Sequence, residues 1–109
     1  MYSIALKKEA LLPRERLLDL GAEQLSNQEL LAILLRTGTK QKPVLEISTQ
    51  ILENLTSLAD FQQLSLQELQ SIQGIGQVKS IEIKAMLELA KRIQKAEYDR
   101  KEQILSSEQ

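Results

Sequence analysis

The chain has 109 residues, a formal net charge of −1, 42% hydrophobic residues and only 3% aromatic residues. This length fits one domain, and a Leu-rich composition with few aromatic residues favours helices over a β-sandwich or barrel. The sequence contains no Cys and no His, which excludes disulfides and the usual zinc sites and removes the commonest general base. We therefore expect a non-enzymatic protein that uses no metal and no cofactor.

The longest unbroken apolar run, residues 30–35, is far shorter than a bilayer requires. The first eight residues lack the basic region followed by an apolar core that defines a signal peptide. We therefore expect a cytoplasmic protein that does not contact a membrane.

In chain order, residues 1–12 show no sustained hydrophobic period, and we expect them to form an N-terminal arm. Pro13 suits the first position of a helix, where its missing N–H costs nothing, and Gly21 is a natural helix stop. A short helix is predicted over residues 14–20. Ser26 and Glu29 then have the spacing of a capping box, which predicts a helix over residues 27–36 that lies near the centre of the core.

Pro43 is predicted to restart a helix with one apolar face, and Ser57 to cap a short turn after it. Ser65 and Glu68 form a second capping box, opening a helix that ends near Ile72. A long helical pattern follows the Gly-rich turn and has an apolar side made of Val78, Ile81, Ala85, Leu89 and Ile93. The pattern is lost over residues 97–109, where we expect a fraying helix or the start of a linker, so the domain proper spans residues 13–96.

An internal repeat supports this division of the chain. Residues 26–33 and 65–72 share the pattern S-x-Q-E-L-x-x-I, and each copy precedes a Gly-containing turn and a second apolar helix. The sequence therefore predicts an all-α domain of five to six short helices, arranged as two related helix–turn–helix units.

The turn of the second unit is the strongest functional signal. Gly74 and Gly76 flank Ile75, which permits a hairpin too tight for side chains to intervene, with Ile75 turned into the core. The amides near Gly74, Gly76 and Val78 are expected to point outward at the positive end of the next helix, where an anion such as phosphate binds. Lys79, on the first turn of that helix, adds a positive charge.

This residue order resembles the helix-hairpin-helix motif of DNA-binding proteins that do not read base sequence, with Ser80 in place of the usual small Ala. The resemblance implies contact with backbone phosphate. The predicted DNA-binding residues are those of the hairpin and the following turn: Gly74, Ile75, Gly76, Gln77, Lys79 and Ser80. The alternative is a turn that only packs two helices, with a solvated lysine.

Longer stretches resemble the N-terminal region of the bacterial RadC family, whose members are named DNA repair proteins. The similar stretches are Pro-Arg-Glu-Arg-Leu-Leu at 13–18, the string ending LLAILLRTGT at 25–39, the hairpin, and Leu-Glu-Leu-Ala-Lys-Arg at 87–92. Members of this family carry a C-terminal MPN/JAB domain with a metal site containing His. Because this chain has no His, that site lies outside it.

The polar turn after the first long helix has two interpretations. In one, Thr37, Gly38, Thr39, Lys40 and Lys42 form a second, degenerate phosphate-binding turn. In the other, which we favour, the glycine is a helix stop and the other residues are a connector.

Two functions remain open from the sequence. The first is a DNA-binding module that grips phosphate weakly and without sequence preference. The second is a protein-interaction or structural module, whose partner is another protein or the MPN/JAB domain of its own chain. The net charge of −1 favours the second function, and the hairpin with its lysine favours the first.

Overall fold

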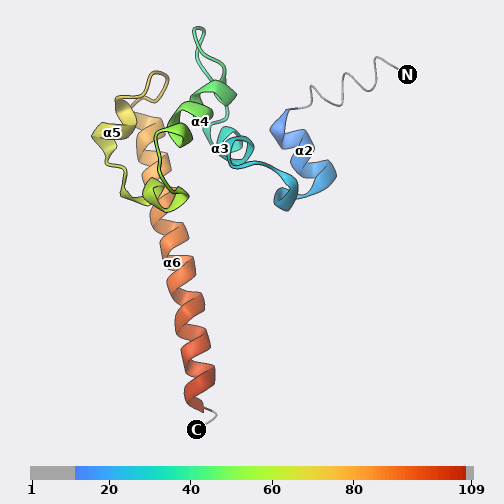
Figure 1. Ribbon diagram of the computed structural model, residues 1–109, viewed down its shortest axis with the longest axis vertical. Helices are drawn as coiled ribbons and strands as arrows, with labels where there is room; N and C mark the ends of the chain where they lie inside the picture. The colour runs from blue at the N-terminus through green and yellow to red at the C-terminus, as the bar shows by residue number, and fades with distance from the viewer. Residues whose placement is uncertain (1–11, 108–109) are drawn as a thin grey trace.

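The structure is a computed structural model that describes residues 12–107, and all regular elements in that range are helices. This confirms the all-α prediction. The expected arm over residues 1–12 lies outside the described residues except for Leu12. The elements are, in order, α2 (Pro13–Leu20), η1 (Ala22–Gln24), α3 (Asn27–Leu35), α4 (Val44–Glu53), η2 (Leu58–Gln63), α5 (Leu66–Gln70) and α6 (Gln77–Ser107), where η marks a 3-10 helix (Figure 1).

The helix boundaries follow the local signals in the sequence. The amide of Glu29 donates to Oγ of Ser26 over 3.1 Å, and the Ser26 amide donates back to the Glu29 carboxylate over 2.9 Å. Ser65 and Glu68 form the same pair of bonds at the start of α5. Both predicted capping boxes are confirmed. The helix that starts at Pro13 ends before Gly21, whose φ is 90°.

The core lies where the α3–α4 pair meets the α5–α6 pair. Its buried apolar side chains come from all four of these helices, from η2 and from the hairpin: Leu31, Leu35, Ile47, Ile51, Phe61, Leu69, Ile75, Ile83 and Leu87. The predicted apolar face of the helix after Pro43 is confirmed, because Val44, Leu52 and Leu55 also pack against this cluster. In addition, Oγ of the fully buried Ser48 lies 3.0 Å from the carbonyl oxygen of Gln28, which ties α4 to α3.

Two apolar surfaces that the hydrophobic pattern would place in the core are exposed in the structure. Leu34 in α3 is about half exposed, so this central helix keeps one open side. The predicted apolar side of α6 faces solvent, whereas Ile83 and Leu87 on the opposite side enter the core. The rotation of α6 is set by the tight hairpin before it, and that rotation turns these two residues inward.

α6 has 31 residues and continues as a helix through residues 97–107, where we expected either a fraying helix or the start of a linker. Residues 97–107 contain no Gly or Pro. Neighbouring charges support the last turns: Lys95 pairs with Asp99 over 3.1 Å and Arg100 with Glu97 over 2.5 Å. In Figure 1, α6 therefore extends as a stem well beyond the packed helices.

Candidate nucleic-acid interface

The turn between α5 and α6 is closed by Gly74, whose φ of 99° is one that residues with a side chain rarely adopt. The backbone also passes close to α4, because a Cβ at this position would lie 2.5 Å from Cδ1 of Ile47. The sequence predicted a hairpin too tight for side chains, and the structure identifies the α4 side chain that makes it so. Glycine is required here both by conformation and by space.

Ile75 is buried in the core, as predicted. Its amide donates to the carbonyl of Ile72 over 3.0 Å, so this donor is satisfied within the hairpin. The Ile75 amide is therefore not available to a ligand.

The start of α6 differs from the starts of α3 and α5, because its first turn contains no acidic residue. The first helical bond runs from the Ser80 amide to the Gly76 carbonyl over 3.0 Å. The amides of Gln77, Val78 and Lys79 consequently have no backbone acceptor within residues 12–107. No atom lies within 4 Å of the Cβ position at Gly76. The positive end of the helix dipole is thus open, and such an end attracts anions.

Ser80 is fully buried between α5 and α6. Its Oγ donates to the carbonyl of Gln77 over 2.8 Å and accepts a bond from Nε2 of Gln70 over 3.1 Å. The residue confirms the expected close packing of the two helices. It is not accessible from outside, so Ser80 and the buried Ile75 position the hairpin, whereas the exposed Gln77 lies on its surface.

Lys79 is not the free cation that the sequence suggested. It is half-buried, and its ammonium group donates to the backbone carbonyl of Thr37 in the turn after α3. A residue at the start of α6, next to the hairpin, therefore holds the turn after α3 in place. This contact joins positions 42 residues apart, and local sequence patterns do not indicate it.

The turn after α3 is built differently from the predicted helix stop. α3 ends at Leu35, and Arg36 takes a φ of 70° and a ψ of −61°. The Thr37 amide donates to the Leu35 carbonyl over 2.8 Å, which closes a γ-turn of the rare, strained kind with positive φ. Gly38 does not have a positive φ, so its interpretation as the helix stop is wrong. Its Cβ would lie 2.3 Å from the carbonyl oxygen of Lys42, so glycine is needed for a close backbone contact.

The rest of this turn is a tight loop closed by two backbone bonds. The Thr39 amide donates to the Lys42 carbonyl over 2.9 Å, and the Lys42 amide donates back over 3.3 Å. The ammonium group of Lys42 donates to Oε1 of Gln50 over 2.6 Å. Lys40 is exposed at the tip and has no partner among the described residues. This lysine is the cation that an external anion reaches most directly.

The two predicted turns lie next to each other. The Cβ position of Gly74 is 3.7 Å from Cγ2 of Thr39, and both turns lie at the end of the molecule from which the stem points away (Figure 1). Segments 36–43 and 74–81 contain no Asp or Glu, but together supply Arg36, Lys40, Lys42 and Lys79. Three lysines, Lys40, Lys42 and Lys79, thus lie at this end of a chain whose net charge is −1, whereas Arg36 is paired with Glu82.

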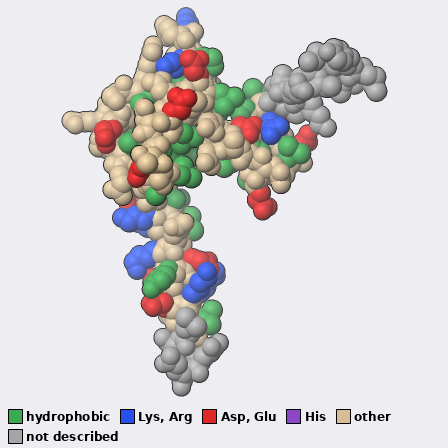
Figure 2. Space-filling view, viewed as in Figure 1, with side chains coloured by type: hydrophobic (Ala, Val, Ile, Leu, Met, Phe, Trp, Pro, Cys, Tyr) green, Lys and Arg blue, Asp and Glu red, His purple; other side chains and the backbone are tan. Residues whose placement is uncertain are grey.

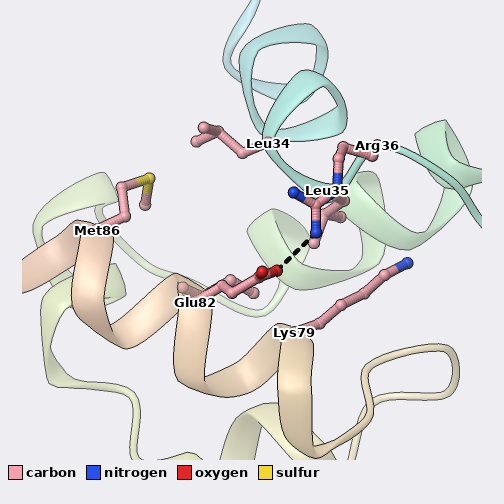
Figure 3. Close-up of a pocket in the computed structure, with 7 residues that line it drawn as sticks. Leu34, Leu35, Arg36, Lys79, Glu82 and Met86 are labelled. Atoms are coloured by element: carbon pink, nitrogen blue, oxygen red, sulfur yellow. Dashed lines mark hydrogen bonds and ion pairs between the residues drawn. The ribbon is translucent and has the colours of Figure 1, made fainter.

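A pocket of about 260 Å³ opens beside the turns, between the end of α3 and α6 (Figure 3). Leu34 and Met86 line one side, and the other side carries an ion pair in which Nη2 of Arg36 lies 2.9 Å from the Glu82 carboxylate. This pair is a second link between the first turn and α6. The sequence offered no signal for it, because it depends on how the two units pack.

Within residues 12–107, no three His, Cys, Asp or Glu side chains come together in a way that would hold a metal ion. A membrane-spanning helix is likewise not found in this range.

Comparisons with other proteins give the chain a family. It is 88% identical over all its 109 residues to a UPF0758 protein of Streptococcus agalactiae, 66% identical to one of Streptococcus thermophilus and 62% identical to one of Streptococcus uberis. In each case it covers 48% of the relative, so the chain spans about half the length of these curated relatives. No solved structure matches it.

The family model described as UPF0758 N-terminal matches residues 4–81. The match includes both turns and ends just inside α6. It agrees with the expectation that this sequence represents the N-terminal region of a longer type of protein. The chain belongs to the UPF0758 family, of which it contains the N-terminal region.

Proposed function

We propose that this region binds the phosphate backbone of DNA without reading base sequence, as a non-enzymatic module of a RadC-like DNA repair protein. The observation that supports the proposal most is the open start of α6. Behind the unobstructed Gly76, three amides without backbone acceptors stand at the positive end of a long helix. Contacts of this kind grip phosphate and carry no sequence information.

The neighbouring turn adds charge to the same surface. Lys40 is exposed there, and Lys42 lies in the same loop. Two or three phosphates are the most that this small set of groups can neutralise, so binding is weak and its salt dependence shallow, with a slope of about −2 to −3 on duplex DNA. Because affinity for phosphate falls as salt rises, low salt is necessary to detect binding this weak.

The buried residues of the predicted site have supporting roles in this proposal. Ile75 anchors the hairpin in the core, and Ser80 keeps α5 and α6 close together. Lys79 holds the first turn beside the hairpin through Thr37. Direct contact with DNA falls to the amides of residues 77–79, the side chain of Gln77 and the exposed Lys40.

The stretches at residues 13–18, 25–39 and 87–92 resemble proteins of the RadC family. A RadC-like protein would carry its MPN/JAB domain in the half that this chain does not span. Any metal-dependent chemistry would then belong to that domain, in a cytoplasmic protein whose N-terminal region positions DNA.

Gly76→Asp tests the proposal sharply, because stability and binding should move in opposite directions. Asp is better than Gly as an N-cap by a few tenths of a kcal/mol, and replacing Gly also makes the unfolded chain less flexible, so the variant should gain about 1 kcal/mol of stability. Its carboxylate would occupy the free amides and repel phosphate, so DNA affinity should fall at least tenfold. Fluorescence anisotropy with labelled duplex and single-stranded DNA at low salt measures the affinity, and thermal unfolding followed by circular dichroism measures the stability.

The matched control is Gln24→Glu, which adds the same charge to an exposed position in η1. This variant should bind DNA like the parent chain. If Gly76→Asp binds as well as the control, phosphate is not held at the start of α6. If the parent chain itself shows no binding at low salt, the DNA proposal is wrong and the protein-interaction or structural alternative is favoured.

A further inference from the structure

α6 carries an apolar face that no other part of the described chain covers. We call this face the α6 stripe and define it by residues spaced three or four apart: Val78, Ile81, Ala85, Leu89 and Ile93. The four large side chains in it are 68%, 50%, 60% and 62% exposed, in that order. The packed helices lie on the opposite side of α6, where Ile83 and Leu87 are buried. The body of the domain therefore cannot cover the stripe.

We propose that the α6 stripe of a second copy of this chain packs against it, with the two helices antiparallel. The order of side-chain sizes supports this partner. When the helices are centred on Leu87, Ile81 of one copy meets Ile93 of the other, and the small Ala85 meets the large Leu89. Small residues facing large ones are what interdigitating helices need. Two copies of the α6 stripe therefore have complementary side-chain sizes when they run antiparallel.

The charges on the stem fit an identical partner. The stripe itself contains no charged residue. On the same part of α6, Arg92 pairs with Glu88 over 3.0 Å and Lys95 pairs with Asp99 over 3.1 Å, both within one helix. No block of like charge remains that would repel a second copy or select a partner of opposite charge. Figure 2 shows blue, red and green side chains mixed along the stem.

The shape of the molecule leaves room for this arrangement. The far part of α6 extends clear of the packed helices (Figure 1). Along the part of α6 that contacts those helices, the stripe lies on the side opposite the buried Ile83 and Leu87. From residue 78 to residue 93 the stripe extends over about 22 Å of helix. An interface of this length is smaller than the standard size, so the dimer is weak and its population depends on concentration. This proposal does not depend on DNA binding.

Sedimentation velocity of the 109-residue chain from about 10 μM to 1 mM measures the association. The parent chain should shift from monomer toward dimer over this range. Leu89→Lys places a charge in the stripe and should leave a monomer at every concentration. The matched control is Leu18→Lys on α2, which makes the same change at a side chain that is 84% exposed and should dimerise like the parent. Circular dichroism confirms that both variants fold.

The relative orientation of the two α6 helices is tested by disulfide formation. The chain has no Cys, so only the introduced cysteines can form disulfides. Val78→Cys and Ala96→Cys meet each other in the antiparallel pair. A mixture of the two variants should form mixed disulfide dimers under mild oxidation, whereas each variant alone should form few. Disulfides within each single variant would overturn the antiparallel arrangement. A parent chain that stays monomeric at 1 mM, or a Leu89→Lys variant that still dimerises, would overturn the proposal itself.

Discussion

The ammonium group of Lys79 donates a hydrogen bond to the backbone carbonyl of Thr37, which joins the turn of one helical unit to the turn of the other. The joined turns are the part of the fold where unused amides and exposed positive charge occur together. Because the contact is made by a side chain that local patterns assign to solvent, it changes what variants of this lysine are expected to do.

Lys79→Gln should lower the stability of the domain. A hydrogen bond from a charged donor contributes about 1 kcal/mol or more, and the loss should lower the thermal midpoint by roughly 4–8 °C. Lys40→Gln removes the same charge at the exposed tip of the first turn and should leave the midpoint unchanged. Thermal unfolding followed by circular dichroism compares the two. Equal midpoints would mean that the contact with Thr37 contributes nothing.

Ile75→Asp should unfold the domain or come close to it, because it buries an unpaired carboxylate in the core. The expected loss is about 3 kcal/mol or more, a large part of the stability of a chain this size. Val78→Asp is the control, since it makes a similar change three residues later at an exposed position. Urea titration measures the free energy of unfolding of both variants. An Ile75→Asp variant as stable as the control would show that residue 75 lies at the surface.

The two glycines of the hairpin should respond differently to alanine. At Gly74 an added methyl group meets Ile47 and a φ of 99°, so Gly74→Ala should cost at least about 1–2 kcal/mol. At Gly76 the space is open and φ is ordinary, so Gly76→Ala gains about 0.4–1 kcal/mol from the less flexible unfolded chain. Ala is a poorer N-cap than Gly, which offsets this gain, so the variant should be close to neutral. Measuring both by chemical unfolding checks the geometry of the turn. The reverse order would contradict it.

Stability should fall in acid partly because of Glu29. The Ser26 amide, followed by Arg16, holds the pKa of this carboxyl below its ordinary value of 4.5. A carboxyl whose folded-state pKa is lowered stabilises the fold fully above the unfolded-state pKa, and this contribution is lost as the pH falls through the folded-state pKa. Glu29→Gln should therefore lower the thermal midpoint by a few degrees at pH 7, and the difference should vanish at pH values well below 4.5.

Glu68→Gln is the matched control for this experiment. Glu68 makes the same capping bond, 2.8 Å from the Ser65 amide, but has no ion pair within the described residues. If Glu29→Gln lowers the thermal midpoint more than Glu68→Gln does, the difference measures the contact with Arg16, whose Nε lies 2.5 Å from the Glu29 carboxylate. Identical pH profiles for the two variants would show that the ion pair adds nothing to the cap.

Local signals in the sequence predicted most of the fold, because capping boxes, Pro and Gly determine where helices start and stop. Ser26, Ser65 and Pro13 all occupy the predicted positions at helix starts. The inward position of Ile75 was also predictable, since a hairpin this tight leaves an aliphatic residue only one direction in which to be buried. These features depend on residues close together in the chain.

The features that the sequence did not predict depend on packing between the units. Nothing near Arg36 indicates a positive φ, because the γ-turn is imposed by the route that the chain takes from α3 to α4. Gly38 correctly indicated a position that requires glycine. The reason is the close approach of the backbone at Lys42, however, and not the end of a helix. The rotation of α6, which exposes Leu89 and buries Leu87, follows from the hairpin and not from the hydrophobic pattern.

Because α6 is one unbroken helix, a small rotation at its anchored end produces a large displacement at its far end. Its 31 residues correspond to about 46 Å of rigid helix, anchored at one end by the hairpin and the core. A tilt of the anchored end by about 10° would move the far end by about 8 Å for this length. Small rearrangements where the two turns meet would therefore appear as large displacements near Ser107, without any change in the helix itself.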